Sequence, residues 1–283
     1  MPGRPAAPPG GPTHARSGPR PNGTLVPNRR IRRPEPRPTG RRHLSSPAMK
    51  RTLLAILTLM LATSALVVGA GPASAATDQE IADQGIIVAG DVPSTWTAEP
   101  SDSSSDKQNL KLAARTKGCK QYVAFAAANE KATKAASDDY SSSNNEQVSN
   151  KSYVHKSEAV ATKVMTAVGS STVADCLSTV FQKAITAEIA KDKSARKAID
   201  SVDMSLEPVD LGDVGVPSVA YEGTLSINLK DGTSQDLDVG LVAVQVEQVV
   251  LTYSLQAPPD AADISDVIAT VVTNTVTRTV NAL

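Results

Sequence analysis

The residues that could carry out acid–base chemistry in this chain are few and isolated. A histidine-based triad would need His155, because His14 and His43 lie in a proline- and arginine-rich leader. No G-x-S-x-G sequence provides a serine nucleophile beside it. We expect His155 to be an exposed residue between the end of a strand and a turn. The sequence therefore assigns no catalytic residue, and it favours a non-catalytic protein.

Paired carboxylates occur at Asp138-Asp139 and at Asp236 and Asp238. Asp236 and Asp238 are two apart in an expected strand, so both point to the same face, which we expect to be the solvent face. The calcium-loop pattern of alternating acids with a central glycine and a terminal glutamate is missing. There is also no phosphate-binding glycine loop or dinucleotide fingerprint. We predict no metal and no cofactor.

The two cysteines, Cys119 and Cys176, admit three interpretations. A metal site lacks ligands, because only His155 could join them and neither belongs to a C-x-x-C pair. A free catalytic thiol would be oxidised outside the cell. In an oxidising compartment an even pair most simply forms one disulfide, so we predict a Cys119–Cys176 bond.

An export signal at residues 49–75 implies such a compartment. Met49-Lys50-Arg51 precedes an uncharged, mostly apolar run from Leu53 to Val68 that is too short to span a bilayer comfortably. Small residues follow, and they predict cleavage after Ala75 or Ala76. The alternative is an uncleaved anchor. We expect a secreted protein without a stable membrane anchor, since no cysteine ends the run to accept an acyl chain.

Residues 1–48 form a leader that is too rich in proline and arginine to fold alone. One interpretation is a basic arm for nucleic acid or anionic lipid. A second is a twin-arginine export signal at Arg41-Arg42. A third is that translation starts at Met49 and the upstream stretch is not part of the protein. We favour the third, because Met49-Lys50-Arg51 already provides a complete start for the general export pathway.

Removing the first 75 residues changes the charge of the protein. The whole chain has 29 basic and 29 acidic residues. Positions 1–75 hold eleven Arg and Lys50 but only Glu35, so 17 basic and 28 acidic residues remain, a net charge of −11. An acidic surface argues against nucleic acid or an anionic membrane as a partner. The remaining 208 residues suffice for one domain, whose core must be largely aliphatic.

The first part of the mature chain predicts mainly helices. We interpret residues 76–106 as an N-terminal arm and a serine-rich linker, and residues 107–283 as the domain. Helical spacing runs from Lys107 to about Ala136, with a break at Gly118. A loop at 137–145 and a strand at 146–155 follow. Two helices come next, beginning after Ser157 and after Thr172.

After Ile199 the apolar period changes to two, which predicts strands. Lys230 to Thr233 carries a strong hairpin signal, and Glu247-Gln248 is expected to reverse the chain again, so that the strands form a meander. A final helix after Pro258 shows one apolar face. The predicted class is α+β, with helices packed on one face of a mainly antiparallel sheet and one disulfide.

Several segments form a recognisable set, namely "VPSTWTAEPSDSSSD", an "LAA" helix with Cys119, "VSNKSYVHKSEAVA", an "ADC" helix with Cys176, the long hairpin and the C-terminal helix. Together they resemble actinobacterial exported proteins related to the extracellular sensor domain of mycobacterial receptor Ser/Thr kinases. They span most of residues 91–283. The chain departs from those sensors in having two cysteines where they have four, and in lacking a kinase domain.

The resemblance implies a sheet-and-helix fold with a cleft that binds ligands rather than catalysing a reaction. We expect a sensor-like module for an unidentified small molecule, glycan or envelope component. The candidate binding residues are Trp96, Tyr153 and Tyr221, although packing at the domain edge is the preferred interpretation of Trp96. A secreted hydrolase with catalytic carboxylates and a wall-associated structural protein are the alternatives.

Overall fold

The computed structural model describes residues 76–101, 104–211, 215–261 and 264–283. The expected leader at 1–48 and the expected signal peptide at 49–75 lie outside these residues. The described residues therefore belong to the expected mature chain.

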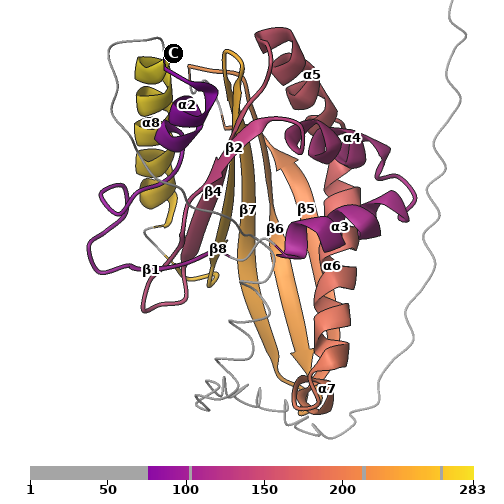
Figure 1. The fold of residues 1–283 in the computed structure, drawn as a ribbon. Helices are drawn as coiled ribbons and strands as arrows, with labels where there is room; N and C mark the ends of the chain where they lie inside the picture. Colours follow the sequence, from indigo (N-terminus) through magenta and orange to yellow (C-terminus); the bar gives the residue numbers. More distant parts are fainter. Residues whose placement is uncertain (1–75, 102–103, 212–214, 262–263) are drawn as a thin grey trace, which may run out of the picture. The chain divides into compact units, whose positions relative to one another are not determined.

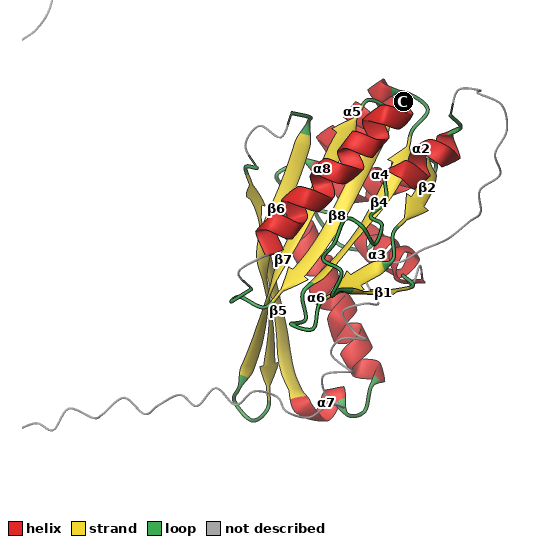
Figure 2. Cartoon of the chain, turned by 90° about the vertical axis from the view of Figure 1, so that its left-hand side faces the viewer, coloured by secondary structure: helices red, strands yellow, loops and turns green. Residues whose placement is uncertain are grey.

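The centre of the described structure is an eight-stranded sheet in which every pairing between neighbours is antiparallel (Figures 1 and 2). The strand order is β1-β3-β4-β8-β7-β6-β5, and β2 also pairs with β4. The strands are β1 (Thr97–Glu99), β2 (Thr133–Ala136), β3 (Asp139–Ser141), β4 (Gln147–Val154), β5 (Ile199–Val209), β6 (Ser218–Leu229), β7 (Ser234–Val246) and β8 (Val249–Ala257).

Helices lie against both faces of this sheet (Figure 1). On one side are α3 (Ser104–Ala114), α4 (Lys120–Asn129), α5 (Glu158–Val168), α6 (Val173–Lys191) and α7 (Ala195–Ala198). On the other are α2 (Asp78–Gln84) and α8 (Ile264–Ala282). Within the described residues, no single helix is long and apolar enough to cross a membrane; α5 and α6 reach that threshold only as a pair, across a bend of 73°.

The α+β class and the antiparallel sheet are confirmed, but the expectation that helices cover one face is corrected. The central strand β8 carries Val249, Val250 and Leu251 in succession, and all three are fully buried. Neighbouring residues of a strand point to opposite faces, so such a run requires a cover on each side. Helices α2 and α8 provide the second cover, around Val271 of α8, which is also fully buried.

The strand meander forms as the sequence predicts. Strands β5 to β8 are consecutive in the chain and adjacent in the sheet. The β6–β7 hairpin turns through Gly232, whose φ of +84° is a backbone conformation that glycine adopts without steric cost. In the β7–β8 turn, Glu247 takes a φ of +49°.

Three short strands lie where no strand was expected, and one of them, β1, belongs to the segment expected as an arm. The predicted loop at 137–145 contains β3, in which Tyr140 pairs with Val148 of β4. The predicted helical stretch ends in β2, where Ala135 pairs with Ser152. Alanine favours helices, so local propensity is overridden at this point by pairing with the long strand β4.

The stretch expected as an arm packs into the core instead. Helix α2 begins with a capping box in which the backbone N–H of Glu80 donates to Thr77 Oγ1 at 3.2 Å and the Thr77 N–H donates to the Glu80 carboxylate at 2.7 Å. Ile81 and Ala82 of this helix and Ile87 after it are buried. The serine-rich segment expected as a linker leads into α3.

A buried ion pair ties this N-terminal segment to α8. The guanidinium of Arg278 donates to both carboxylate oxygens of Asp91, at 2.8 and 2.7 Å, and also to the carbonyl oxygens of Gln84 and Ile86. Burial alone would raise the pKa of Asp91, but the hydrogen bonds from Arg278 and the Val88 N–H outweigh it and lower the pKa. Asp91 and Arg278 are far apart in the sequence, and their ion pair holds the N-terminal segment against α8 on the second face of the sheet.

The predicted disulfide is present. Cys119 and Cys176 are bonded and are only 1% and 2% exposed. Cys119 directly precedes α4, and Cys176 lies in the first turns of α6. The bond therefore fastens two helices of the same layer to each other.

Candidate functional site

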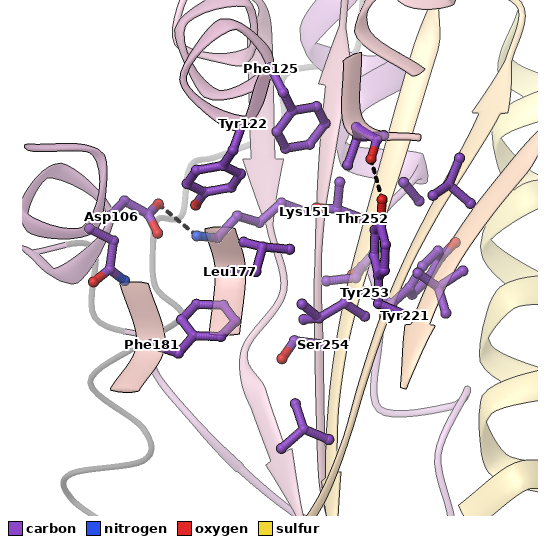
Figure 3. A pocket seen from close by; sticks show the side chains of 18 of the residues that line it. Asp106, Tyr122, Phe125, Lys151, Leu177, Phe181, Tyr221, Thr252, Tyr253 and Ser254 are labelled. Atoms are coloured by element: carbon purple, nitrogen blue, oxygen red, sulfur yellow. Dashed lines mark hydrogen bonds and ion pairs between the residues drawn. The ribbon is translucent and has the colours of Figure 1, made fainter. Parts of the chain in front are cut away.

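A cavity of about 170 Å³ lies between the sheet and the helices α3 to α6 (Figure 3). Its walls are mostly aliphatic and aromatic. A few polar side chains interrupt them, namely Asp106, Asn109, Lys151, Thr252, Ser254 and Gln256.

The floor of the cavity consists of alternate residues of β7 and β8. In the register of these strands, Thr252 is opposite Ala243, Ser254 is opposite Leu241 and Gln256 is opposite Val239. Residues two apart in a strand share a face, so β8 contributes a line of polar groups beside an apolar line from β7. Alternation along two adjacent strands thus gives one polar and one apolar side to the floor.

The roof is aromatic and is held by the disulfide. Helix α4 contributes Tyr122 and Phe125, whose rings stack with centroids 6.3 Å apart and planes inclined by 28°. Helix α6 contributes Leu177 and Phe181. Since the disulfide joins α4 to α6, it fixes the two sides of the roof relative to each other.

One ion pair lies in the cavity wall. The ammonium of Lys151, on β4, donates to the Asp106 carboxylate of α3 at 2.6 Å (Figure 3). The Lys151 side chain is 12% exposed and that of Asp106 is 38% exposed, so the pair reaches from the interior toward solvent.

A second carboxylate, Asp139 of β3, also acts on Lys151. Burial raises the pKa of Asp139 to about 6, although hydrogen bonding to Ser149 and the charge of Lys151 both oppose the rise. The positive charge of Lys151 is therefore compensated within the protein by Asp106, with further attraction from Asp139.

The tyrosines of the cavity are neutral at physiological pH. Burial raises the pKa of Tyr122 to about 12, and the negative charge of Asp106 adds to the effect. Burial raises the pKa of Tyr153 in the same way. The hydroxyl of Tyr221, whose pKa is also raised by burial, donates to the carbonyl oxygen of Val168 at the end of α5. Burial also raises the pKa of Tyr253, the fourth tyrosine of the lining. None of the four phenols is therefore poised to act as a base near neutral pH.

Gln256 has an unmet hydrogen-bonding requirement. It is 9% exposed, and its Oε1 is buried without a hydrogen-bond partner anywhere in the described part of the chain. A buried acceptor left unpaired costs about 1–3 kcal/mol, which a suitable donor would recover.

The structure brings together two of the three predicted site residues. Tyr153 and Tyr221 line the same cavity although they are far apart in the sequence. Trp96 does not line it: it is half-buried and packs against the core cluster on the opposite face of the sheet. This placement agrees with the preferred interpretation of Trp96 as a packing residue.

The expectation for His155 is corrected. His155 is 4% exposed rather than exposed, and it continues the chain from β4 with its N–H donating to the Gln248 carbonyl. Burial lowers its pKa. Its Nε2 has no partner among the described residues. The polar residues next to His155 in the sequence predicted a surface position. In the structure the β7–β8 turn lies against His155, and the residue is buried.

The remaining acidic candidates do not gather into a site. Among residues 76–283, outside the undescribed gaps, no three His, Cys, Asp or Glu side chains are placed to hold a metal ion. Asp236 and Asp238 are exposed, and Asp236 accepts a hydrogen bond from Ser226. Asp138 is exposed as well.

Sequence reasoning missed most of the polar lining. Lys151 lies within the strand segment that was predicted, and its alternation with Tyr153 was a usable signal that both face the same side. Gln256 gave a comparable signal, because it is a polar residue at a strand position whose side chain faces the core. Asn109 and Asp106 could not be placed, because nothing in the sequence shows where α3 crosses the sheet.

These features define an α+β domain with one mainly apolar cavity under a disulfide-fastened roof. No known family and no curated protein matches the sequence of this chain. Among solved structures, it is similar to the extracellular domain of PknH from Mycobacterium tuberculosis, at 10% identity and a TM-score of 0.37, covering 73% of this chain and 98% of that domain.

A second similar structure is the Ran-binding protein Mog1p of Saccharomyces cerevisiae. Its identity is 9% and its TM-score 0.20, and the match covers 51% of this chain and 72% of that protein. The first of these is a weak structural relation only, and no sequence family supports the resemblance noted in the sequence. At these TM-scores the similarities carry no functional argument, so function is argued from the cavity.

Proposed function

We propose that this chain is a secreted, non-catalytic domain that binds a small molecule in the cavity between the sheet and α3–α6, in the manner of a sensor module. The observation that carries the proposal is the cavity itself. A concave, mainly apolar space with a few convergent polar groups is the usual form of a small-molecule site. The cavity, of about 170 Å³, gives room for a small molecule beside these groups.

The chemistry of the lining favours binding over catalysis. Asp106 is the one carboxylate among the residues that line the described cavity, and it is engaged by Lys151 at 2.6 Å. The phenols are held neutral by burial. General acid–base catalysis needs a group that exchanges a proton near the working pH, and burial moves the phenols of the lining away from that state.

A location outside the cytoplasm is supported by the disulfide together with the export signal expected at residues 49–75. Disulfides persist in oxidising compartments and are rare in reducing ones.

The test is ligand-dependent stabilisation combined with a change that fills the cavity. The melting temperature of the mature protein is measured against a panel of small molecules and glycans, since a ligand that binds only the folded state raises it. Leu241→Trp places a large side chain on the cavity floor and should abolish the shift. Leu211→Trp is the matched control, because Leu211 is exposed and outside the cavity, and it should leave the shift intact.

A panel without any shift in the unmodified protein would contradict the proposal. Turnover of a panel compound that is lost in Asp106→Asn would instead support a hydrolase and refute the non-catalytic assignment.

A further inference from the structure

We propose that the cavity selects an uncharged, mainly apolar molecule with one hydrogen-bond-donating group, such as an alcohol, and that this group donates to Gln256. The inference rests on the proposed function and narrows it to a class of ligand. Three features of the lining carry it: the compensated charge of Lys151, the unpaired amide oxygen of Gln256 and the apolar wall of β7 and α6 beside them.

The charged groups disfavour a charged ligand. An anion would have to displace Asp106 from Lys151, breaking an ion pair of 2.6 Å whose lysine is mostly buried. A cation would be repelled by Lys151, or would have to take Asp106 away from it and leave the ammonium uncompensated. Either ligand would also lose its own hydration on entering a mainly apolar space, which is costly for an ion. A neutral molecule avoids all of these losses.

The amide of Gln256 supplies the polar preference. Its Oε1 can accept a hydrogen bond but has no donor among the described residues, and in this conformation the oxygen is itself buried rather than open to the cavity. The terminal torsion of glutamine is broad, so the amide can turn toward a bound group without leaving a favoured rotamer. A ligand hydroxyl beside it would provide the donor that the protein itself lacks.

The apolar residues of β7 and α6, which lie beside the polar line of β8, are suited to an apolar chain. Lys151 is paired with Thr252 of β8, and Gln256 lies four residues further along the same strand. At roughly 3.3 Å per residue this separates the two ends by about 13 Å. Leu241 and Phe181 are among the apolar side chains that line the cavity with them. A ligand with its donor at Gln256 can therefore extend its apolar part along the floor.

Matched chain molecules test the inference by calorimetric titration of the mature protein. The probes are octanol, heptyl methyl ether, octanoate and octylammonium. The ether has the same number of non-hydrogen atoms as octanol but no donor. We expect octanol to bind about tenfold more tightly than the ether, as one recovered hydrogen bond implies, and both ions to bind more weakly than the ether.

Two variants assign the preference to Gln256. Gln256→Met removes the amide at similar size and should reduce the octanol-to-ether ratio to about one. Gln235→Met is the control, because Gln235 also has an unpaired buried Oε1 on a neighbouring strand but does not line the cavity, and it should keep the tenfold ratio.

The outcomes separate the two proposals. Equal binding of octanol and ether, tighter binding of octanoate or octylammonium, or an unchanged ratio in Gln256→Met would overturn the inference while leaving a binding cavity in place. Failure of all four probes to bind the unmodified protein would overturn the inference, and an unresponsive panel of other small molecules and glycans would remove the proposed function with it.

Discussion

Removing the disulfide should destabilise this domain strongly and weaken ligand binding together. The change is Cys119→Ser combined with Cys176→Ser, which leaves no free thiol in the described chain. The two residues are 57 apart in the sequence, and closing a loop of that length contributes about 4 kcal/mol in the chain-entropy model. That is a large share of the net stability of a typical domain.

The assay is urea unfolding followed by fluorescence of Trp96, the one tryptophan of the whole sequence. Trp96 lies on the far face of the sheet from the disulfide, so it reports cooperative loss of the fold rather than a local change at α4 or α6. We expect the free energy of unfolding to fall by about 4 kcal/mol and the melting temperature by about 10 °C. The unmodified protein under strong reductant should behave as the double variant does.

The same variant tests the link between the bond and the site. Because the disulfide fastens α4 to α6, its loss should loosen the roof formed by Phe125 and Phe181 and weaken octanol binding at a temperature where the variant is still folded. A loss of stability below about 1 kcal/mol would refute the chain-entropy reasoning. An unchanged affinity in a destabilised variant would refute the claim that the bond holds the roof.

Three further predictions follow from the packing and the charges. Ala243→Leu adds atoms at the cavity and should change stability by less than about 1 kcal/mol, whereas Ala220→Leu, equally buried on the other face, should cost about 1–3 kcal/mol in urea unfolding; equal costs would mean that the cavity offers no room. Arg278→Met leaves Asp91 buried without its counter-charge and should cost about 3 kcal/mol, and adding Asp91→Asn should recover part of that loss; a cost near zero would contradict a buried pair. The raised pKa of Asp139, about 6 against 3.8, means that its contribution to stability is complete below the lower value and is lost as pH rises through the higher one. Asp139→Asn should therefore stabilise the protein more at about pH 7 than at about pH 4, and equal effects at both would show that the carboxyl is not perturbed.

Much of the fold follows from periodicity in the sequence. The change to a period of two after Ile199, the Lys230–Thr233 turn and the pairing of two cysteines are local signals with few alternative solutions, and the structure confirms each of them. The number of helical layers was harder to predict, because the alternation of apolar and polar residues along β6 gives way to a continuous apolar run in β8. That run was the available sign of burial on both faces.

The site was predictable only in part, for reasons of tertiary placement. Tyr153 and Tyr221 were predicted from their residue type. They line one cavity because their side chains lie on the face of β4 and β6 that is covered by α3–α6. Their role in binding stays a prediction. Burial of His155 and packing of residues 76–101 depend on contacts with segments 44 to 194 residues away, which no local pattern contains. The orphaned oxygen of Gln256 becomes visible only when its surroundings are known.

The central claim is that an uncharged apolar ligand occupies the cavity between the sheet and α3–α6. Methyl NMR of protein labelled at leucine, titrated with octanol, tests it directly. We expect shift changes and ligand-to-protein NOEs at Leu225 and Leu241, which line the cavity, and none at Leu251 and Leu255, which lie in the core on the opposite face. NOEs to Leu251 and Leu255 instead, or no NOE at any of the four at saturating octanol, would contradict it.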